Sequence, residues 1–191
     1  MKISIITINY NNAVGLEKTI NSVVQQNYKL EYIVIDGGST DGSQVIIERY
    51  KTNITHSLSE QDSGIYNAMN KGISLATGDY LLFINSGDIL TKNTAIQEVV
   101  NRQCAEDLII CDLVYIKDGK KQIWIPENKL RFDSLYHHSI PHPSTFIKRA
   151  LFDLIGPYDE SLKIVSDWKF FMLAICKHNC TYKRLPFAIT E

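Results

Sequence analysis

Cysteine is scarce in this sequence, with four residues among 191, at Cys104, Cys111, Cys176 and Cys180. A chain of this length buries a sufficient core without disulfide bonds, and these spacings form no dense disulfide framework. Cys176 and Cys180 flank a histidine, but the two thiols stand four residues apart and no partner pair lies nearby. We therefore expect buried free thiols here rather than a metal centre.

An excess of charge of either sign is also lacking. The chain carries 20 basic and 21 acidic residues, a net charge of −1, and no block of like charge. This balance excludes binding to nucleic acid through a bulk basic surface. No apolar stretch is long enough to span a bilayer, and the N-terminus enters an apolar strand without a secretory leader. We therefore expect a protein of the reducing cytoplasm.

Two nucleotide-binding motifs are missing as well. The sequence has neither G-x-G-x-x-G after its first strand nor the P-loop G-x-x-x-x-G-K-[ST], which disfavours a Rossmann dehydrogenase and a P-loop kinase. The first half instead alternates strands with helices. Apolar runs predict strands at residues 2–9, 31–36, 54–59 and 80–84, and helical periodicity marks residues 14–26, 41–50, 65–73 and 91–102. This order predicts an α/β fold with a doubly wound, mainly parallel sheet and helices on both faces.

The pattern changes after residue 103. Strands at 107–116 and 121–125 enclose Asp118-Gly119, a hairpin signal that predicts a small antiparallel region. Residues 130–137 are weakly helical. Residues 142–148 resemble an edge strand because Pro143 lacks an amide donor. We expect helices at 149–155 and 166–177, the second capped by Ser166, and a final strand at 181–189.

Three strand ends of the first half carry polar loops, namely Asn9-Tyr10, residues 36–39 and residues 85–88. Right-handed crossovers place these ends at one edge of the sheet, where open α/β sheets bind ligands. The buried strand 80–84 delivers Asp88 to this edge. A carboxylate there suits a divalent cation that neutralises a diphosphate, although an Asp that caps the next helix is the plain alternative.

A second acid is needed as a base, and the second half offers Asp159, Glu160 and Asp167. Asp167 is the best placed of the three, in the first turn of a helix. The alternative is that the helix dipole alone favours an acid at that position.

Five stretches in a fixed order carry a family resemblance: residues 4–11, 33–43, 61–72, 78–88, and 142–168 with its segments H-P-S-T-F, G-P-Y-D-E and S-D-W. In them the chain resembles the family 2 inverting glycosyltransferases with the GT-A nucleotide-sugar fold, especially those of bacterial polysaccharide assembly. The resemblance implies one GT-A catalytic domain over residues 1–191. Residues 1–103 would form its nucleotide-binding half and residues 104–191 its acceptor-binding half.

The resemblance also implies roles for individual residues. Asp167 corresponds to the catalytic base and Asp88 to the ligand of Mg²⁺ or Mn²⁺. The positions implied for nucleotide binding are Thr7, Asn9, Tyr10, Asp36, Ser39, Asp62, Lys71 and Ser86. Those implied for the acceptor or the diphosphate are His142, Ser144 and Trp168, with a role at the edge of the core an equal alternative for His142.

Two departures from the family pattern stand out. The first acid of the D-x-D motif is replaced by Ser86, or by Asn85 in another alignment, and the chain stops at Glu191 where family members usually continue. We therefore expect a short member or a truncated polypeptide. The aromatic residues Trp124, Phe132, Tyr136 and Trp168 are expected in the core by default, with an acceptor groove or a dimer patch as alternatives.

The implied reaction moves a sugar, with inversion, from a nucleotide-diphosphate sugar to a saccharide or lipid-linked saccharide. It would take place in the cytoplasm or at the inner face of the membrane, with peripheral membrane association compatible. Two alternatives stand beside it. One is a non-catalytic nucleotide-sugar-binding protein, which Ser86 and the short C-terminus favour. The other is a nucleotidyltransferase, which ranks low because residues 9–12 lack the glycine and basic residues that hold a triphosphate.

Overall fold

The computed structural model describes all residues 1–191, and its strands form one eight-stranded sheet in the order β3-β2-β1-β4-β7-β5-β6, with β8 paired to β5. The strands are β1 (Ile3–Asn9), β2 (Glu31–Asp36), β3 (His56–Ser59), β4 (Tyr80–Phe83), β5 (Leu108–Lys117), β6 (Lys120–Trp124), β7 (Thr145–Lys148) and β8 (Tyr182–Thr190). Strands β1 to β4 are parallel, whereas β7 runs antiparallel to both β4 and β5. The mainly parallel sheet with an antiparallel second region is confirmed.

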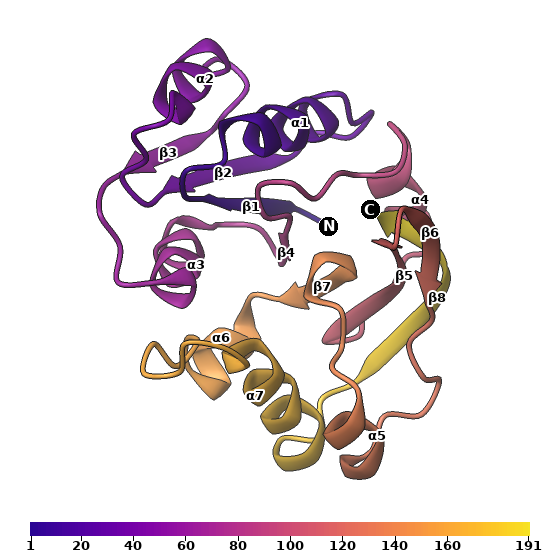
Figure 1. Cartoon of the computed structure of the whole chain (residues 1–191). Coiled ribbons are helices and arrows are strands. Elements are labelled where there is room, and N and C mark those ends of the chain that lie inside the picture. The colour runs from indigo at the N-terminus through magenta and orange to yellow at the C-terminus, as the bar shows by residue number, and fades with distance from the viewer.

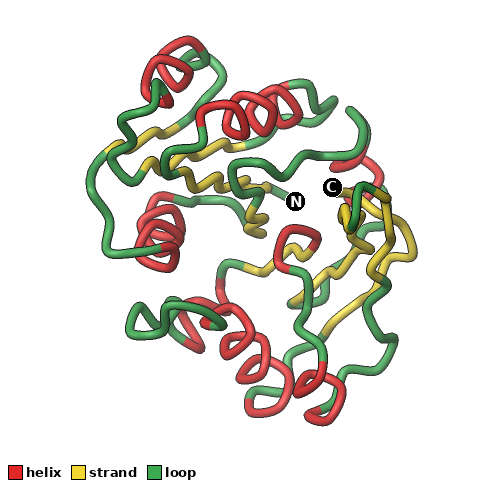
Figure 2. Tube along the Cα trace, viewed as in Figure 1, coloured by secondary structure: helices red, strands yellow, loops and turns green.

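Helices cover both faces of this sheet (Figure 1). They are α1 (Ala13–Val24), α2 (Ser43–Arg49), α3 (Ile65–Leu75), α4 (Ala95–Val100), α5 (Phe132–His137), α6 (Ala150–Ile155) and α7 (Ser166–Met172), with a 3₁₀ turn η1 (His142–Ser144) and a π-helical turn η2 (Leu173–Lys177). In Figure 2, a loop at the left carries the chain from β3 to α3. The doubly wound arrangement predicted for the first half is therefore confirmed.

The core has two layers, one on each side of the sheet. Along β1, Ile6 and Ile8 pack into the layer beneath α3, α6 and α7, while Ile3 and Ile5 pack into the layer beneath α1, α2 and α4. Successive side chains of a strand point to opposite faces, so a strand covered on both faces needs apolar residues at every position. This explains why the apolar runs of the first half show no polar alternation.

The hairpin between β5 and β6 turns at the predicted dipeptide. Asp118 has φ = 53° and Gly119 has φ = 72°, both in the left-handed region that a tight two-residue hairpin turn requires. The register Lys117↔Lys120 confirms the predicted turn position.

Three predictions about the elements were wrong. Strand β7 lies inside the sheet between β4 and β5, because Pro143 falls in the preceding turn η1, where its missing amide interrupts no ladder. Ser166 does not cap α7, because its hydroxyl accepts a hydrogen bond from the Asp159 amide at 2.6 Å, and Val165 precedes the helix at φ = 68°. Helix α4 begins late, because the amide of Thr91 pairs with the carbonyl of Ile189 in β8.

The cysteines are all free, as expected, but their burial is mixed. Cys111 and Cys180 are buried, Cys104 is half-buried and Cys176 is exposed. No helix is both long and apolar enough to cross a membrane.

Candidate active site

The polar loops after β1, β2 and β4 meet at the carboxyl edge of the sheet, as the strand order predicts. The side-chain amide of Asn9 donates to the Asp36 carboxylate at 2.8 Å, and that of Asn12 donates to the backbone carbonyl of Ser86 at 3.0 Å. These two bonds join all three loops.

Asp36 holds the loop after β2 in place from inside the protein. Its side chain is fully buried and accepts hydrogen bonds from Asn9, from the amide and hydroxyl of Ser39, and from the hydroxyl of Ser59. Burial alone would raise its pKa, but these hydrogen bonds outweigh burial and lower the pKa. Because its oxygens are occupied by the protein, Asp36 orders the loop rather than facing a ligand.

A cavity of about 720 Å³ opens beside these loops. Its lining consists of Ile8, Asn9, Tyr10, Gly37, Gly38, Gln61, Asp62, Gly64, Ile65, Ala68, Asn85 and Ser86. Four of the residues implied for nucleotide binding therefore line it, namely Asn9, Tyr10, Asp62 and Ser86. We call it the donor cavity, after the nucleotide-sugar donor that the family resemblance implies.

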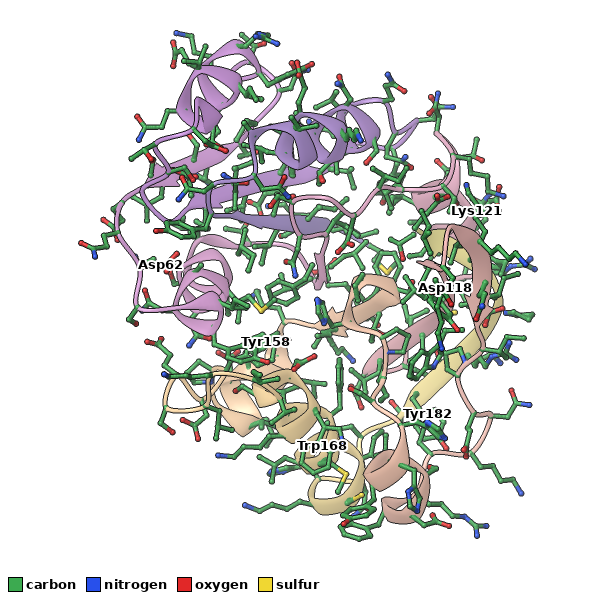
Figure 3. All side chains as sticks on the ribbon, in the orientation of Figure 1. Asp62, Asp118, Lys121, Tyr158, Trp168 and Tyr182 are labelled. Atoms are coloured by element: carbon green, nitrogen blue, oxygen red, sulfur yellow. The ribbon has the colours of Figure 1, made fainter.

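Tyr10 and Asp62 form one end of the donor cavity. The Tyr10 side chain is 67% exposed, and Asp62, on the loop that precedes α3 (Figure 3), accepts a hydrogen bond from the Gly64 amide at 3.0 Å. A Cβ added to Gly37 would lie 2.3 Å from Asp62 Oδ2 and 3.3 Å from the Tyr10 ring. Glycine at this position therefore lets the carboxylate and the ring approach the floor of the cavity.

The other implied nucleotide-binding residues lie outside the donor-cavity lining. The buried Thr7 hydroxyl contacts Tyr32 Oη at 3.0 Å and the Ile84 carbonyl at 2.7 Å. Ser39 is buried in the Asp36 network, and its hydroxyl also accepts from the Asn11 amide. Lys71 Nζ forms an ion pair with Glu60 at 2.8 Å.

Asp88 lies after β4 with a half-buried carboxylate, while its backbone carbonyl accepts a hydrogen bond from Thr19 Oγ1 at 2.7 Å. Burial raises the pKa of Asp88, opposed by the positive charge that His142 carries when protonated. A carboxylate in this position is stabilised in its ionised form by a cation. No cluster of three or more His, Cys, Asp or Glu side chains surrounds it. The residues therefore fit a hard cation that takes one protein carboxylate and completes its shell with substrate phosphate oxygens and water.

Asp167 is the centre of a hydrogen-bonded chain of side chains. The Tyr66 hydroxyl donates to Asp167 Oδ1 at 2.8 Å, and His142 Nδ1 lies 3.1 Å from Asp167 Oδ2. His142 Nε2 in turn lies 3.2 Å from the side-chain nitrogen of Asn85, which lines the donor cavity. With the Asn85 amide donating to Nε2, a neutral imidazole donates its Nδ1 proton to the carboxylate.

The environment of Asp167 keeps it ionised at neutral pH. Burial alone would raise its pKa, but the hydrogen bond from His142, the charge that His142 carries when protonated and the Tyr66 hydroxyl lower it. The same contact acts on Tyr66, whose pKa burial and the neighbouring Asp167 raise to about 12. Tyr66 therefore stays a hydrogen-bond donor.

The three acids proposed as the base lie in different settings. Asp159 pairs with Lys169 Nζ at 2.6 Å, and Glu160 accepts hydrogen bonds from Asn67 and Asn70. Of the three acids, only Asp167 belongs to the hydrogen-bonded series of side chains that reaches the donor cavity. This position favours Asp167 over Asp159 and Glu160 as the candidate base.

Two of the residues implied for binding the acceptor or the diphosphate have side chains that form no hydrogen bond with Asp167 and do not line the donor cavity. Ser144 is fully buried, with its hydroxyl against that of Thr190 in β8. Trp168 lies between α7 and α5 (Figure 3), where its indole donates to the Leu135 carbonyl at 2.6 Å. Of this group, only His142 contacts the candidate base.

No local pattern assigns a role to Tyr66, because its contact with Asp167 joins residues 101 positions apart. Asn85 stood in the polar loop, but nothing in the sequence pointed to its contact with His142. Both contacts depend on β7 and α7 folding back against α3 and β4.

Known proteins resemble this chain in both sequence and fold. The model of the family described as Glycosyl transferase family 2 matches residues 4–160. A PGL/p-HBAD biosynthesis glycosyltransferase of Mycobacterium tuberculosis is 31% identical over 175 residues, which cover 87% of this chain and 67% of that protein. An uncharacterized glycosyltransferase of Rickettsia prowazekii is 30% identical over 189 residues, covering 90% of this chain and 59% of its own.

Solved structures share the fold over nearly the whole chain. Staphylococcus aureus TarS in complex with UDP superposes with a TM-score of 0.81 at 22% identity, covering 100% of this chain and 60% of TarS 1-349. The mannosyltransferase PcManGT from Pyrobaculum calidifontis, in complex with GDP-Man and Mn²⁺, gives a TM-score of 0.73 at 17% identity, covering 97% and 55%. The chain thus spans about 60% of the length of the TarS chain it matches.

The fold is that of the GT-A glycosyltransferases, with the donor cavity at the carboxyl edge of the sheet. The chain belongs to glycosyl transferase family 2, as the family match and the curated relatives show.

Proposed function

We propose that this protein transfers a sugar from a nucleoside-diphosphate sugar to an acceptor hydroxyl, with inversion at the anomeric carbon. One observation carries the proposal: the hydrogen-bonded series Tyr66–Asp167–His142–Asn85 connects a half-buried carboxylate to the lining of the donor cavity. A base is thereby held next to the place where a bound sugar donor would present its reacting carbon.

Residues 1–103 form the nucleotide-binding half of a single catalytic domain in this proposal. The base of the nucleotide lies against the exposed Tyr10 ring, and the Asp62 carboxylate accepts hydrogen bonds from it. The diphosphate then extends toward Asn85 and Ser86 at the other end of the cavity. Crystals of TarS with UDP and of PcManGT with GDP-Man support a nucleotide-sugar donor.

Asp88 would hold a divalent cation, Mg²⁺ or Mn²⁺, for which the PcManGT complex with Mn²⁺ gives support. Such an ion, when bound, supplies positive charge that neutralises the departing diphosphate. The single carboxylate is sufficient because Mg²⁺-type sites take most of their ligands from phosphates and water.

The proton is handled by the protein. As the acceptor oxygen bonds to the anomeric carbon, its proton passes to the Asp167 carboxylate. The bond from that carbon to the diphosphate oxygen breaks with its electron pair, and attack opposite the leaving group inverts the configuration. Tyr66 and His142 keep Asp167 oriented throughout, and a well-placed base typically contributes about 10²–10⁴-fold in rate.

The acceptor is a saccharide or lipid-linked saccharide, bound by residues 104–191, and the reaction belongs to polysaccharide or glycolipid assembly in the cytoplasm or at the inner face of the membrane. The mycobacterial relative named as a PGL/p-HBAD biosynthesis glycosyltransferase supports a role in glycoconjugate assembly.

The test is a thermal-shift screen of UDP, GDP and their sugar conjugates with and without Mn²⁺, followed by turnover assays on the donors that bind. We expect dose-dependent stabilisation by one nucleotide and an inverted anomer in the product, read by NMR. Binding without turnover of any donor, with acceptors supplied, would instead support a non-catalytic nucleotide-sugar-binding protein. Absence of nucleotide binding would contradict the proposal altogether.

A further inference from the structure

A second hollow, of about 360 Å³, lies between β6 and α5 and has no role in the site described above. Tyr115, Trp124, Pro126, Leu130 and Ile140 give it apolar walls, and Glu127, Ser134, His138 and Ser139 give it polar groups. We name it the β6–α5 trough. The aromatic residues around it are only partly covered, so the default expectation of a core position does not hold for Trp124, which is 36% exposed.

The two aromatic side chains of the trough are held in place by the hairpin. In the β5–β6 register Trp124 pairs with Leu113 and Tyr115 pairs with Gln122, so Trp124 and Tyr115 are diagonal neighbours on one face, roughly 7–8 Å apart. The Tyr115 hydroxyl donates to Gln122 at 2.6 Å, and the Trp124 ring meets His138 edge-on at 6.1 Å. The trough is therefore built on paired strands rather than on a free loop.

The trough leads to the candidate base. Its wall includes Ile140, and His142, two residues further along, contacts Asp167, a span of at most ~7 Å of chain. A neighbouring hollow of about 370 Å³ is lined by both Tyr115 and Asp88, so Tyr115 borders both the trough and the hollow beside the loop after β4.

The trough lies on the acceptor side of the molecule. The strand order puts β6 at the opposite edge of the sheet from β3 and the donor-cavity loops beside it, an arrangement visible in Figure 1. A ligand in the trough would thus lie toward the β6 edge of the sheet, away from the donor-cavity loops after β1 and β2.

The lining selects the class of ligand. A sugar ring offers a C–H face to an aromatic wall and hydroxyls to polar side chains, and the trough has both. Glu127 is its one charged lining residue, apart from what His138 adds when protonated, so an anionic headgroup or nucleotide would meet repulsion there. An apolar lipid tail would cover the Glu127 carboxylate without offering it a hydrogen-bond donor.

We propose that the β6–α5 trough binds a neutral saccharide ring of the acceptor, with Trp124 as its stacking platform. This inference rests on the proposed function for its biological meaning, since it names the part of the acceptor that lies beyond the reacting hydroxyl. The binding itself needs no donor.

The experiment uses the full chain and a panel of neutral disaccharides (cellobiose, maltose, chitobiose and mannobiose), titrated in ¹H–¹⁵N NMR. The protein has two tryptophans, so two indole N–H signals are expected, and Trp124→Phe assigns them. We expect at least one disaccharide to shift the Trp124 signal saturably, while the Trp168 signal, anchored on a carbonyl, stays in place.

Affinity is then compared by saturation-transfer NMR in two variants. Trp124→Ala should weaken the disaccharide roughly tenfold through loss of the stacking surface. Tyr136→Ala is the matched control, because Tyr136 is an exposed aromatic residue of the adjacent α5 that does not line the trough, and it should bind as the wild type does.

The trough assignment is overturned if no disaccharide in the panel shifts the Trp124 signal, or if Trp124→Ala binds as tightly as the wild type. Nucleotide binding, measured separately by calorimetry, should be equal in all variants. A wild-type protein that binds a disaccharide but no nucleotide would retain the trough and reject the proposed transferase function.

Discussion

Tyr66→Phe isolates the hydrogen bond that fixes the candidate base. Tyr66 is buried, and its hydroxyl donates a hydrogen bond to Asp167 Oδ1 at 2.8 Å. A hydrogen bond to a charged group contributes about 1.5–3 kcal/mol to the free energy of unfolding. We expect the free energy of unfolding at pH 7 to fall by about that amount, with an unchanged m-value in urea. Because the lost bond favours ionised Asp167, its pKa rises, and the stability difference from the wild type narrows as the pH falls below about 4.

Tyr158→Phe is the matched control. The Tyr158 ring lies 5.6 Å from that of Tyr66, and its buried hydroxyl has no hydrogen-bond partner. Removing an unpartnered hydroxyl should leave stability unchanged or raise it. Equal losses in the two variants would show that Tyr66 acts only by packing. In transfer assays Tyr66→Phe should lower kcat without weakening nucleotide binding, since Tyr66 does not line the donor cavity.

Three other changes test separate parts of the structure. Burial would raise the pKa of Glu31, but hydrogen bonds from neighbouring groups lower it to about 2. Ionised Glu31 therefore adds about 3 kcal/mol to the free energy of unfolding above pH ~4.5, and this contribution is lost as the pH falls toward 2. In an acid titration followed by circular dichroism, Glu31→Gln should lack this pH-dependent loss of stability. Gly37→Ala places a Cβ 2.3 Å from Asp62 Oδ2 and should weaken nucleotide binding roughly tenfold in calorimetry, at unchanged melting temperature. Asp88→Asn removes a half-buried charge, so its melting temperature should be no lower than that of the wild type. The variant should lose any rise in melting temperature that Mn²⁺ with a nucleotide gives the wild type. If that rise is retained, the metal is bound elsewhere.

Much of the fold followed from the sequence because local signals agreed with the final packing. The apolar runs of β1, β2 and β4 predicted buried parallel strands, and Asp118-Gly119 predicted the hairpin position. The wrong predictions concern elements whose position depends on contacts with segments that are distant in the sequence. The position of β7 inside the sheet depends on its pairing with β4 and β5, which no local pattern around Pro143 records.

In the candidate site, too, local sequence signals predicted some features, whereas others depend on contacts with distant residues. Ordered motifs brought Asn9, Tyr10, Asp62 and Ser86 to one cavity, because they follow strand ends that share an edge. Asp36 also follows a strand, yet its side chain turns inward to hydroxyl donors, a choice that depends on Ser59 from the next strand. Family position therefore identified the region of the site better than the orientation of each side chain.

Asp167, joined to the donor cavity through His142 and Asn85, acts in this proposal as the base of a sugar-transfer reaction. Asp167→Asn, assayed with the donor that binds the wild type, tests this role most directly: the variant keeps the shape of the side chain but has no carboxylate to take the proton. We predict a fall in kcat of about 10²–10⁴-fold with nucleotide affinity unchanged in calorimetry. Near-normal turnover by this variant would contradict the assignment and the mechanism built on it.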